Sequence, residues 1–147
     1  MVKLIGAVLI VFATAYIGTR ISARKKLRVE QLFLIEKILT EFSEEIKYSA
    51  EPYESLKEKY LSRESYEKLD GMNEDSLAIS LEEKAEIREF SEQSGRCGRD
   101  MQVMLCESFA ERIGRRARDA EKTIASEVKV INAVGFFSGV ILSLLIL

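Results

Sequence analysis

The sequence contains no histidine and no tryptophan, a single proline and only two cysteines among its 147 residues. Without histidine, neither cysteine has an imidazole base to convert it into a thiolate nucleophile. A tetrahedral zinc site within one chain would need carboxylates to complete it. The carboxylates are scattered along polar faces, and a phosphate-cradling G-x-x-x-x-G-K motif is absent. We therefore expect no enzyme activity, no catalytic residue, no metal site and no cofactor.

Acidic residues are missing from one end of the chain. Residues 1–29 contain six basic side chains and no acidic one, whereas residues 30–89 contain 17 acidic side chains and 8 basic ones. The formal net charge of −2 therefore conceals a basic neck and an acidic body. A second basic run, residues 112–122, also contains Asp119 and Glu121 and adjoins an apolar stretch. That arrangement favours membrane anchoring over nucleic acid binding, so no nucleic acid partner is expected.

Two stretches, residues 4–19 and 130–147, contain no charged residue at all. At ~1.5 Å per residue, an 18-residue helix reaches about 27 Å, close to the ~30 Å hydrocarbon core of a bilayer. A water-soluble body of this size has no room to surround an all-apolar helix. We predict transmembrane helices over residues 1–22 and 130–147, with a cytoplasmic helical bundle over residues 23–129 between them.

Basic residues beside each apolar stretch set the expected topology. Because Lys and Arg resist translocation, the body should be cytoplasmic and both termini should lie on the outer face. The alternative is an exported helical protein, since Ala13, Thr14 and Ala15 offer a small-x-small signal-peptide cleavage pattern. Cleavage there would carry the basic neck across the membrane, which favours a retained helix.

Small residues occur where membrane helices can approach each other closely. Gly135 and Gly139 form a G-x-x-x-G pattern in the second apolar stretch. Gly6, Thr14 and Gly18 supply flat patches in the first. Close backbone approach drives helix association in lipid, so Gly135 and Gly139 are candidate helix-packing residues.

Apolar residues of the body repeat with helical spacing. The first seam has spacings of three and four and predicts an amphipathic helix; it comprises Leu32, Ile35, Leu39, Phe42 and Ile46. Pro52 should end or kink this helix and begin a second one, running to about residue 68. Residues 69–80 show no period and are predicted to form a loop.

Two further helices are expected after this loop. Ser80 and Glu83 predict a capping box at the start of a helix ending near residue 94. Its expected buried residues are Leu81, Ala85 or Ile87, and Phe90. Two glycines interrupt the pattern at residues 94–100. The last helix is expected from about Asp100 to Leu147, with an apolar seam of Cys106, Ala110, Ile113, Ala117, Ala120, Ile124 and Ile131. Four helical segments without an alternating strand pattern predict an all-α bundle.

Both ends of the sequence resemble a known family. The opening MVKLIGAVLIVFATAYIG, the segment EEIKYSAEPYESL and the terminal VGFFSGVILSLLIL are similar to the stage III sporulation protein AB family of endospore-forming bacteria. The resemblance covers residues 1–58 and 90–147. The family's tyrosine and proline after its first long helix match Tyr48 and Pro52, and its terminal glycine pair matches Gly135 and Gly139.

A third family pattern matches only in part. The family carries a glycine, an acid and a glutamine before its last helix. Gly95 and Gln102 fit this pattern, but Gly98 stands in the place of the acid and Asp100 follows two residues later. The chain is also shorter in its middle than the family suggests.

The resemblance implies a non-catalytic inner-membrane platform in a secretion-like channel between mother cell and forespore. It implies a helical domain like those of type II secretion and type IV pilus platform proteins, located in the mother-cell membrane that faces the forespore. The implied partners are a cytoplasmic secretion-type ATPase and multispan channel subunits, which an acidic bundle is suited to dock. The alternative is a membrane-anchored signalling or regulatory adaptor that binds a soluble partner. The oligomeric state remains open.

Overall fold

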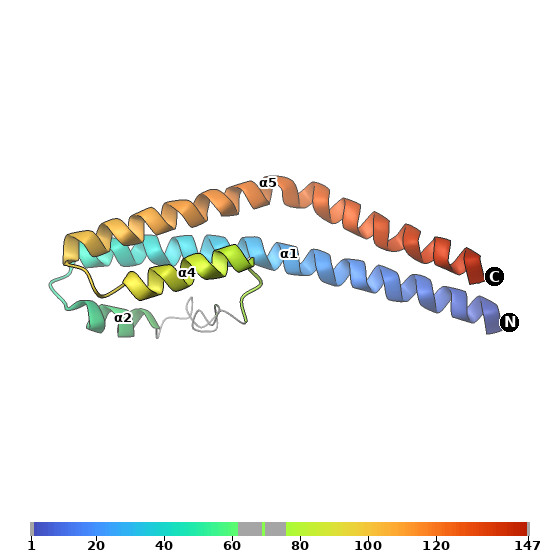
Figure 1. The fold of residues 1–147 in the computed structure, drawn as a ribbon, viewed down its shortest axis with the longest axis horizontal. Coiled ribbons are helices and arrows are strands. Elements are labelled where there is room, and N and C mark those ends of the chain that lie inside the picture. The colour runs from blue at the N-terminus through green and yellow to red at the C-terminus, as the bar shows by residue number, and fades with distance from the viewer. Residues whose placement is uncertain (1, 62–68, 70–75, 147) are drawn as a thin grey trace. The chain divides into compact units, whose positions relative to one another are not determined.

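The computed structural model describes residues 2–61, 69 and 76–146, with the backbone alone for residues 2–5, 7, 61 and 146. These residues form four helices and no strand, as Figure 1 shows, so the predicted all-α class is confirmed. The helices are α1 (Val2–Tyr48), α2 (Tyr53–Leu61), α4 (Leu81–Gln93) and α5 (Arg99–Ile146). The chain divides into two compact units. We call Arg28–Asp119 the body unit, and Met1–Leu27 with Ala120–Leu147 the terminal unit.

The core of the body unit is built on one face of α1. All five residues of its predicted seam are buried: Leu32, Ile35, Leu39, Phe42 and Ile46. The predicted seam of α5 is buried at Cys106, Ala110, Ile113 and Ala117, whereas its last three residues, Ala120, Ile124 and Ile131, are half-buried. Within this unit α2 and α4 lie along α1 and α5 (Figure 1). The 3.6-residue period is thus confirmed as the pattern of the core.

The first predicted helix break is confirmed. α1 ends at Tyr48 and α2 begins at Tyr53, directly after Pro52. Proline suits this place because the first turn of a helix leaves its amide groups without intrahelical partners. The rings of Tyr53 and Tyr60 then pack edge-on against Phe42, with centroids 5.6 and 5.1 Å away, and fix α2 to α1. The expected continuation of this helix to residue 68 lies outside the described residues.

The capping box at the start of α4 is also confirmed. The Glu83 amide donates to Ser80 Oγ at 3.3 Å, and the Ser80 amide donates to Glu83 Oε2 at 2.7 Å. The burial predicted for Leu81 was wrong, because this side chain is 86% exposed. The capping box turns Glu83 inward, and helical geometry then directs the residue two positions earlier outward.

Further along α4, Ile87 is buried and Ala85 is exposed. Phe90 is half-buried and stacks on Phe109 of α5 with centroids 4.8 Å apart. The segment before α4 adds three core residues that its lack of period concealed, Leu69, Leu77 and Ile79. The Ala78 amide donates to Gln31 Oε1 at 2.7 Å and ties this segment to α1.

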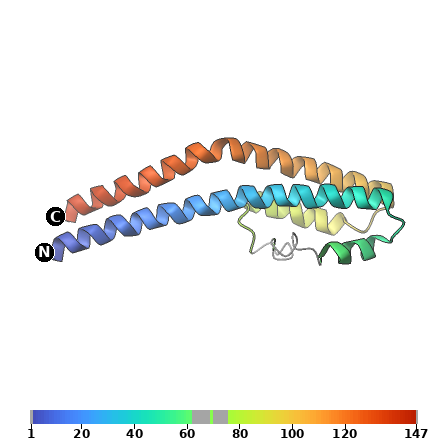
Figure 2. The ribbon, with the colours of Figure 1, turned by 180° about the vertical axis from the view of Figure 1, so that it is seen from behind.

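In the terminal unit, the beginning of α1 and the end of α5 lie side by side and antiparallel (Figures 1 and 2). Among the described residues one helix, over Arg99–Leu145, is long and apolar enough to cross a membrane. Only 6% of its most apolar 18-residue stretch is buried. This exposure favours lipid contact over a place in a soluble core, where such a helix would be covered on all sides.

Candidate functional site

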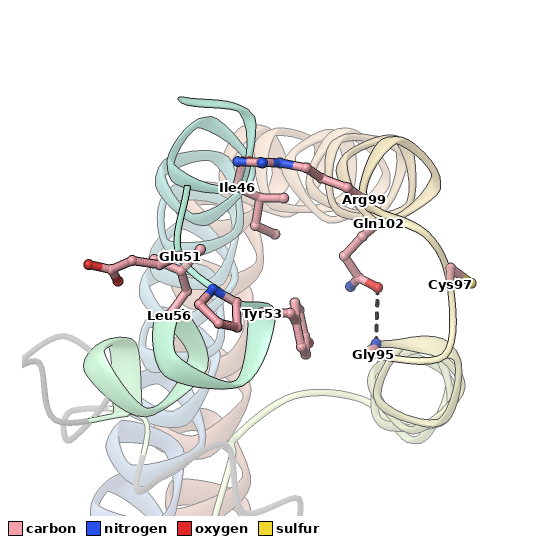
Figure 3. A pocket seen from close by; sticks show the side chains of 9 residues that line it. Ile46, Glu51, Tyr53, Leu56, Gly95, Cys97, Arg99 and Gln102 are labelled. Atoms are coloured by element: carbon pink, nitrogen blue, oxygen red, sulfur yellow. Dashed lines mark hydrogen bonds between the residues drawn. The ribbon is translucent and has the colours of Figure 1, made fainter. Parts of the chain in front are cut away.

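Besides the pair Gly135 and Gly139, the family resemblance marks four positions. Three of these four line one cavity of the body unit. Pro52 comes from the turn between α1 and α2, Gly95 from the turn between α4 and α5, and Gln102 from the start of α5 (Figure 3). The cavity has a volume of about 260 Å³, and its other lining residues are Ile46, Glu51, Tyr53, Leu56, Cys97 and Arg99. We call it the turn cavity. Tyr48 does not line it.

Gln102 joins the turn before α5 to the helix itself. Its side chain is 2% exposed, and its Oε1 accepts a hydrogen bond from the Gly95 amide at 3.0 Å (Figure 3). Its Nε2 donates to Ser94 Oγ at 3.0 Å, and the same hydroxyl is hydrogen-bonded to the hydroxyl of Tyr53. Both ends of the buried amide are therefore satisfied, which offsets its desolvation. Through Ser94 this network links α2, α4 and α5.

The backbone conformation at residue 95 requires glycine. Its φ is +82°, a left-handed conformation that costs other residues free energy and that commonly follows the end of a helix. A Cβ at this position would also lie 3.1 Å from Cε1 of Tyr53. Gly98, where the family has an acid, differs, because a Cβ there would meet no atom within 4 Å. A side chain would therefore fit at position 98, so steric crowding does not explain why this chain has glycine where the family has an acid.

Arg99 connects the ends of the two long helices. Its Nε donates to the carbonyl oxygen of Ile46 at 2.7 Å, and so satisfies one of the last carbonyl groups of α1. Ile46 and Leu56 give the turn cavity an apolar floor, whereas the side chain of Glu51 points away from it (Figure 3). The only thiol in the lining, Cys97, is exposed and has no base beside it among the lining residues. The lining thus combines apolar side chains with the polar groups of Gln102 and Arg99.

Tyr48 belongs to an adjacent acidic surface. Its side chain is 85% exposed, and it borders a hollow of about 350 Å³. The other lining residues are Glu41, Glu44, Glu45, Ser49 and Tyr60, and we call these six residues the Tyr48 surface. Glu45 is paired with Lys59 at 2.7 Å and Glu41 with Lys37 at 3.9 Å, and the side chains of Glu41 and Glu44 are exposed. The surface combines a large exposed ring with negative charge.

The basic run of α5 was predicted to anchor the chain at the membrane, but two of its arginines form ion pairs within the body unit. Arg118 pairs with Glu36 of α1 at 2.9 Å, and Arg116 pairs with Glu82 at 3.5 Å and with Glu86, both in α4. These arginines therefore hold the body unit together, in addition to any membrane anchoring. Spacing in the sequence could not show this, because each partner lies 30 or more residues away in the chain.

Sequence reasoning also missed the buried ion pair of Arg28 with Glu83. Glu83 is fully buried, and both of its oxygens accept hydrogen bonds from the Arg28 guanidinium. Burial alone would raise the pKa of Glu83, but the hydrogen bonds from Arg28 and Ser80 and the charge of Arg28 outweigh it and lower the pKa. The capping box marked Glu83 in the sequence, yet no signal pointed to Arg28 as its partner.

The candidate helix-packing glycines face the first apolar stretch within the terminal unit. A Cβ on Gly135 would lie 3.1 Å from the carbonyl oxygen of Thr14, and one on Gly139 would lie 3.0 Å from Cα of Val11. Gly18 lies on the same contact, 3.5 Å from the position of that Gly135 Cβ. Next to these residues, Ser22 Oγ donates to Asn132 Oδ1 at 3.0 Å. The two backbones approach closely where each helix carries small residues.

The sequence model of the stage III sporulation protein AB family matches residues 3–74 and 57–147, two segments that together cover nearly the whole chain. No curated protein and no solved structure matches the chain. Within the part of the chain that the structure describes, no group of three or more Cys, Asp or Glu side chains is arranged to hold a metal ion.

Proposed function

The chain belongs to the stage III sporulation protein AB family, and from this membership we propose that it is a non-catalytic platform of a sporulation-specific, secretion-like channel. Membership implies a role in stage III of sporulation. The proposal adds that the body unit docks a cytoplasmic ATPase, while the terminal unit contacts other channel subunits in the mother-cell membrane. The observation that supports it most is the family match over both halves of the chain.

The proposed membrane topology has two spans. Residues 1–22 and 130–147 would cross the membrane, and residues 23–129 would lie in the cytoplasm. The length and apolar character of α5 support the second span, and the antiparallel pairing of the terminal unit supports a first span beside it. The five basic side chains between residues 20 and 28 support the cytoplasmic side for the residues that follow, because Lys and Arg resist translocation. The glycines Gly135 and Gly139 would pack the two spans together.

A thiol-labelling experiment tests this topology. Cys97 is exposed and Cys106 is buried, so a membrane-impermeant maleimide has one accessible target. We expect no labelling in intact cells and labelling of Cys97 after permeabilisation. Labelling in intact cells would show that the body is exported, as expected if the chain were cleaved after Ala15.

The proposed ATPase-binding region is the Tyr48 surface. Exposed aromatic rings are frequent anchors of protein interfaces, and Tyr48 makes little contact with its own chain. The exposed carboxylates of Glu41 and Glu44 beside it would attract a basic partner surface and speed the encounter. The turn cavity gives the same end of the body unit a second, apolar contact.

Affinity purification from sporulating cells tests the docking proposal with a matched pair of variants. Tyr48→Ala removes the proposed anchor, and Leu81→Ala removes a side chain that is equally exposed, 86% against 85%, elsewhere on the body unit. We expect the wild type and Leu81→Ala to bring down a secretion-type ATPase and multispan channel subunits, and Tyr48→Ala to lose the ATPase alone. If the wild type instead brings down only a soluble regulator, the adaptor alternative is correct.

A further inference from the structure

One face of α1 in the terminal unit changes from apolar to cationic along its length. The residues Leu9, Phe12, Tyr16, Arg20 and Arg24 follow one another at spacings of three and four, so they form one stripe on the helix. The side chains of the first three are 63, 70 and 62% exposed, and both arginines are exposed as well. We call these five residues the lipid stripe.

The lipid stripe faces away from the partner helix. Two of the α1 residues that meet α5 are Gly18, whose Cβ would lie 3.5 Å from the carbonyl oxygen of Ile131, and Ser22, which is 5% exposed. With 3.6 residues per turn, Arg20 lies roughly opposite to both of them. Within the terminal unit, the stripe is therefore left uncovered.

The positive charge of the stripe is not neutralised by any acidic side chain that the structure describes. The guanidinium of Arg20 lies over the ring of Tyr16, 5.8 Å from its centroid, in a cation–π contact. Arg20 and Arg24 make no ion pair with any residue that the structure describes. The other element of the unit offers two acids, Glu121 and Glu127, and Glu127 is engaged by Lys25 at 2.6 Å.

We propose that the lipid stripe binds one anionic phospholipid of the cytoplasmic leaflet. Two arginines one turn apart offer paired donors to a phosphate group, an arrangement that guanidinium groups favour. Tyr16 would lie at the level of the glycerol backbone, where aromatic rings concentrate in membrane proteins, and Phe12 and Leu9 would contact an acyl chain. The stripe spans about 22 Å, roughly one leaflet with its headgroups.

Net charge decides in favour of an anionic lipid over a zwitterionic one. Residues 1–29 contain no acidic side chain, so the two arginines of the stripe have no negatively charged neighbour on this part of α1. The resulting positive potential attracts a headgroup with a net negative charge and repels the cationic group of a zwitterionic headgroup. This inference rests on the proposed topology, because it needs residues 9–16 to lie within the membrane.

Native mass spectrometry of the full chain tests the inference. The chain is reconstituted into nanodiscs of phosphatidylcholine with a minor fraction of phosphatidylglycerol, and the lipids retained after transfer to detergent are counted. The variant R20Q/R24Q is compared with K26Q/K129Q, which also removes two exposed positive charges from the terminal unit but leaves the stripe intact. We expect the wild type and K26Q/K129Q to retain phosphatidylglycerol, and R20Q/R24Q to lose the preference by roughly tenfold or more.

The outcomes separate a specific site from general attraction. An equal loss in both double variants, or no preference for phosphatidylglycerol in the wild type, would overturn the inference. If R20Q/R24Q does not fold, Tyr16→Leu keeps every charge and should still reduce the retained lipid. Displacement of the lipid by inorganic phosphate, but not by chloride at equal ionic strength, would show a free-anion site and also overturn it. A chain extracted from membranes by carbonate would contradict the proposed topology instead.

Discussion

The guanidinium of Arg28 in α1 and the carboxylate of Glu83 in α4 meet in two hydrogen bonds. Nη2 lies 2.6 Å from Oε1, and Nε lies 3.1 Å from Oε2. Because Glu83 is fully buried and also accepts from the Ser80 amide, its charge is compensated on several sides. Glu83 thereby caps α4 and also attaches this helix to α1.

Removal of Arg28 should destabilise the body unit strongly. In Arg28→Ala the carboxylate of Glu83 stays buried without its counter-ion, which typically costs about 3 kcal/mol or more. Thermal unfolding of the full chain in detergent, followed by circular dichroism, measures the loss. Lys37→Ala is the control, because its ion pair with Glu41 is exposed and 3.9 Å long. Equal shifts in the two variants would contradict a structural role for the buried pair.

The same pair should make stability depend on acid pH. The pKa of Glu83 is lower in the folded chain than its ordinary value of about 4.3, so the folded state binds this proton less readily than the unfolded state. The stabilisation is therefore complete above that ordinary value and is lost as pH falls through the lower folded pKa. Unfolding temperatures measured from pH 7 down to pH 3 should fall more steeply for the wild type than for Glu83→Gln.

Substitution by alanine should destabilise the chain at Gly95 but not at Gly98. Gly95→Ala forces a positive φ on alanine and brings its Cβ against Tyr53, so it should cost about 1–2 kcal/mol or more. Gly98→Ala has open space and should leave stability nearly unchanged. Chemical denaturation of both variants, compared with the wild type, measures the difference. Similar effects would show that the turn cavity tolerates a side chain at Gly95.

The two thiols should differ in reactivity. Burial, partly opposed by a hydrogen bond with Gln102, raises the pKa of the Cys106 thiol to about 11, so it remains protonated near neutral pH. Intact-mass measurement after maleimide treatment of the folded chain should therefore show one added group, and Cys97→Ser should abolish it. In denaturant the wild type should add two. A second addition under native conditions would show that the core around Cys106 opens readily.

The glycines of the terminal unit should differ in their tolerance of a methyl group. In Gly139→Ala the new Cβ meets Val11 Cα and the Thr14 side chain, and overpacking of this kind costs about 1–3 kcal/mol. Gly6→Ala is the matched control, since a Cβ there meets nothing within 4 Å. Thermal stability of the two variants in detergent compares them. If Gly139→Ala is as stable as Gly6→Ala, the two apolar stretches do not pack through this glycine.

Most of the helical architecture was predictable because burial along a helix repeats every 3.6 residues. The seam from Leu32 to Ile46, the break at Pro52 and the capping box at Ser80 were all identified from local signals, and the structure confirms them. Local signals failed where burial has no period, at Leu77 and Ile79, and where a cap overrode hydrophobicity, at Leu81.

The candidate site was predictable only as separate positions. Pro52, Gly95 and Gln102 could be marked by resemblance to the family, but the sequence held no sign that they line one cavity. Ser94 and Tyr53, which complete the hydrogen-bond network, lie 41 residues apart, and their hydrogen bond was not predicted. Their meeting depends on two turns that bring α2 and α4 to the same end of α1 and α5.

By itself, the amino-acid sequence determined the helical class, the boundaries of most helices, the two charge-free stretches and the family, because these follow from periodicity, turn residues and composition. The tertiary structure alone decided which charges became structural. Arg28, Arg116 and Arg118 belong to basic runs that were predicted to lie at the membrane surface. Each of them is instead paired with an acidic side chain of the body unit. The physical reason is that ion pairing depends on distance in space, and packing of the helices sets that distance independently of separation along the chain.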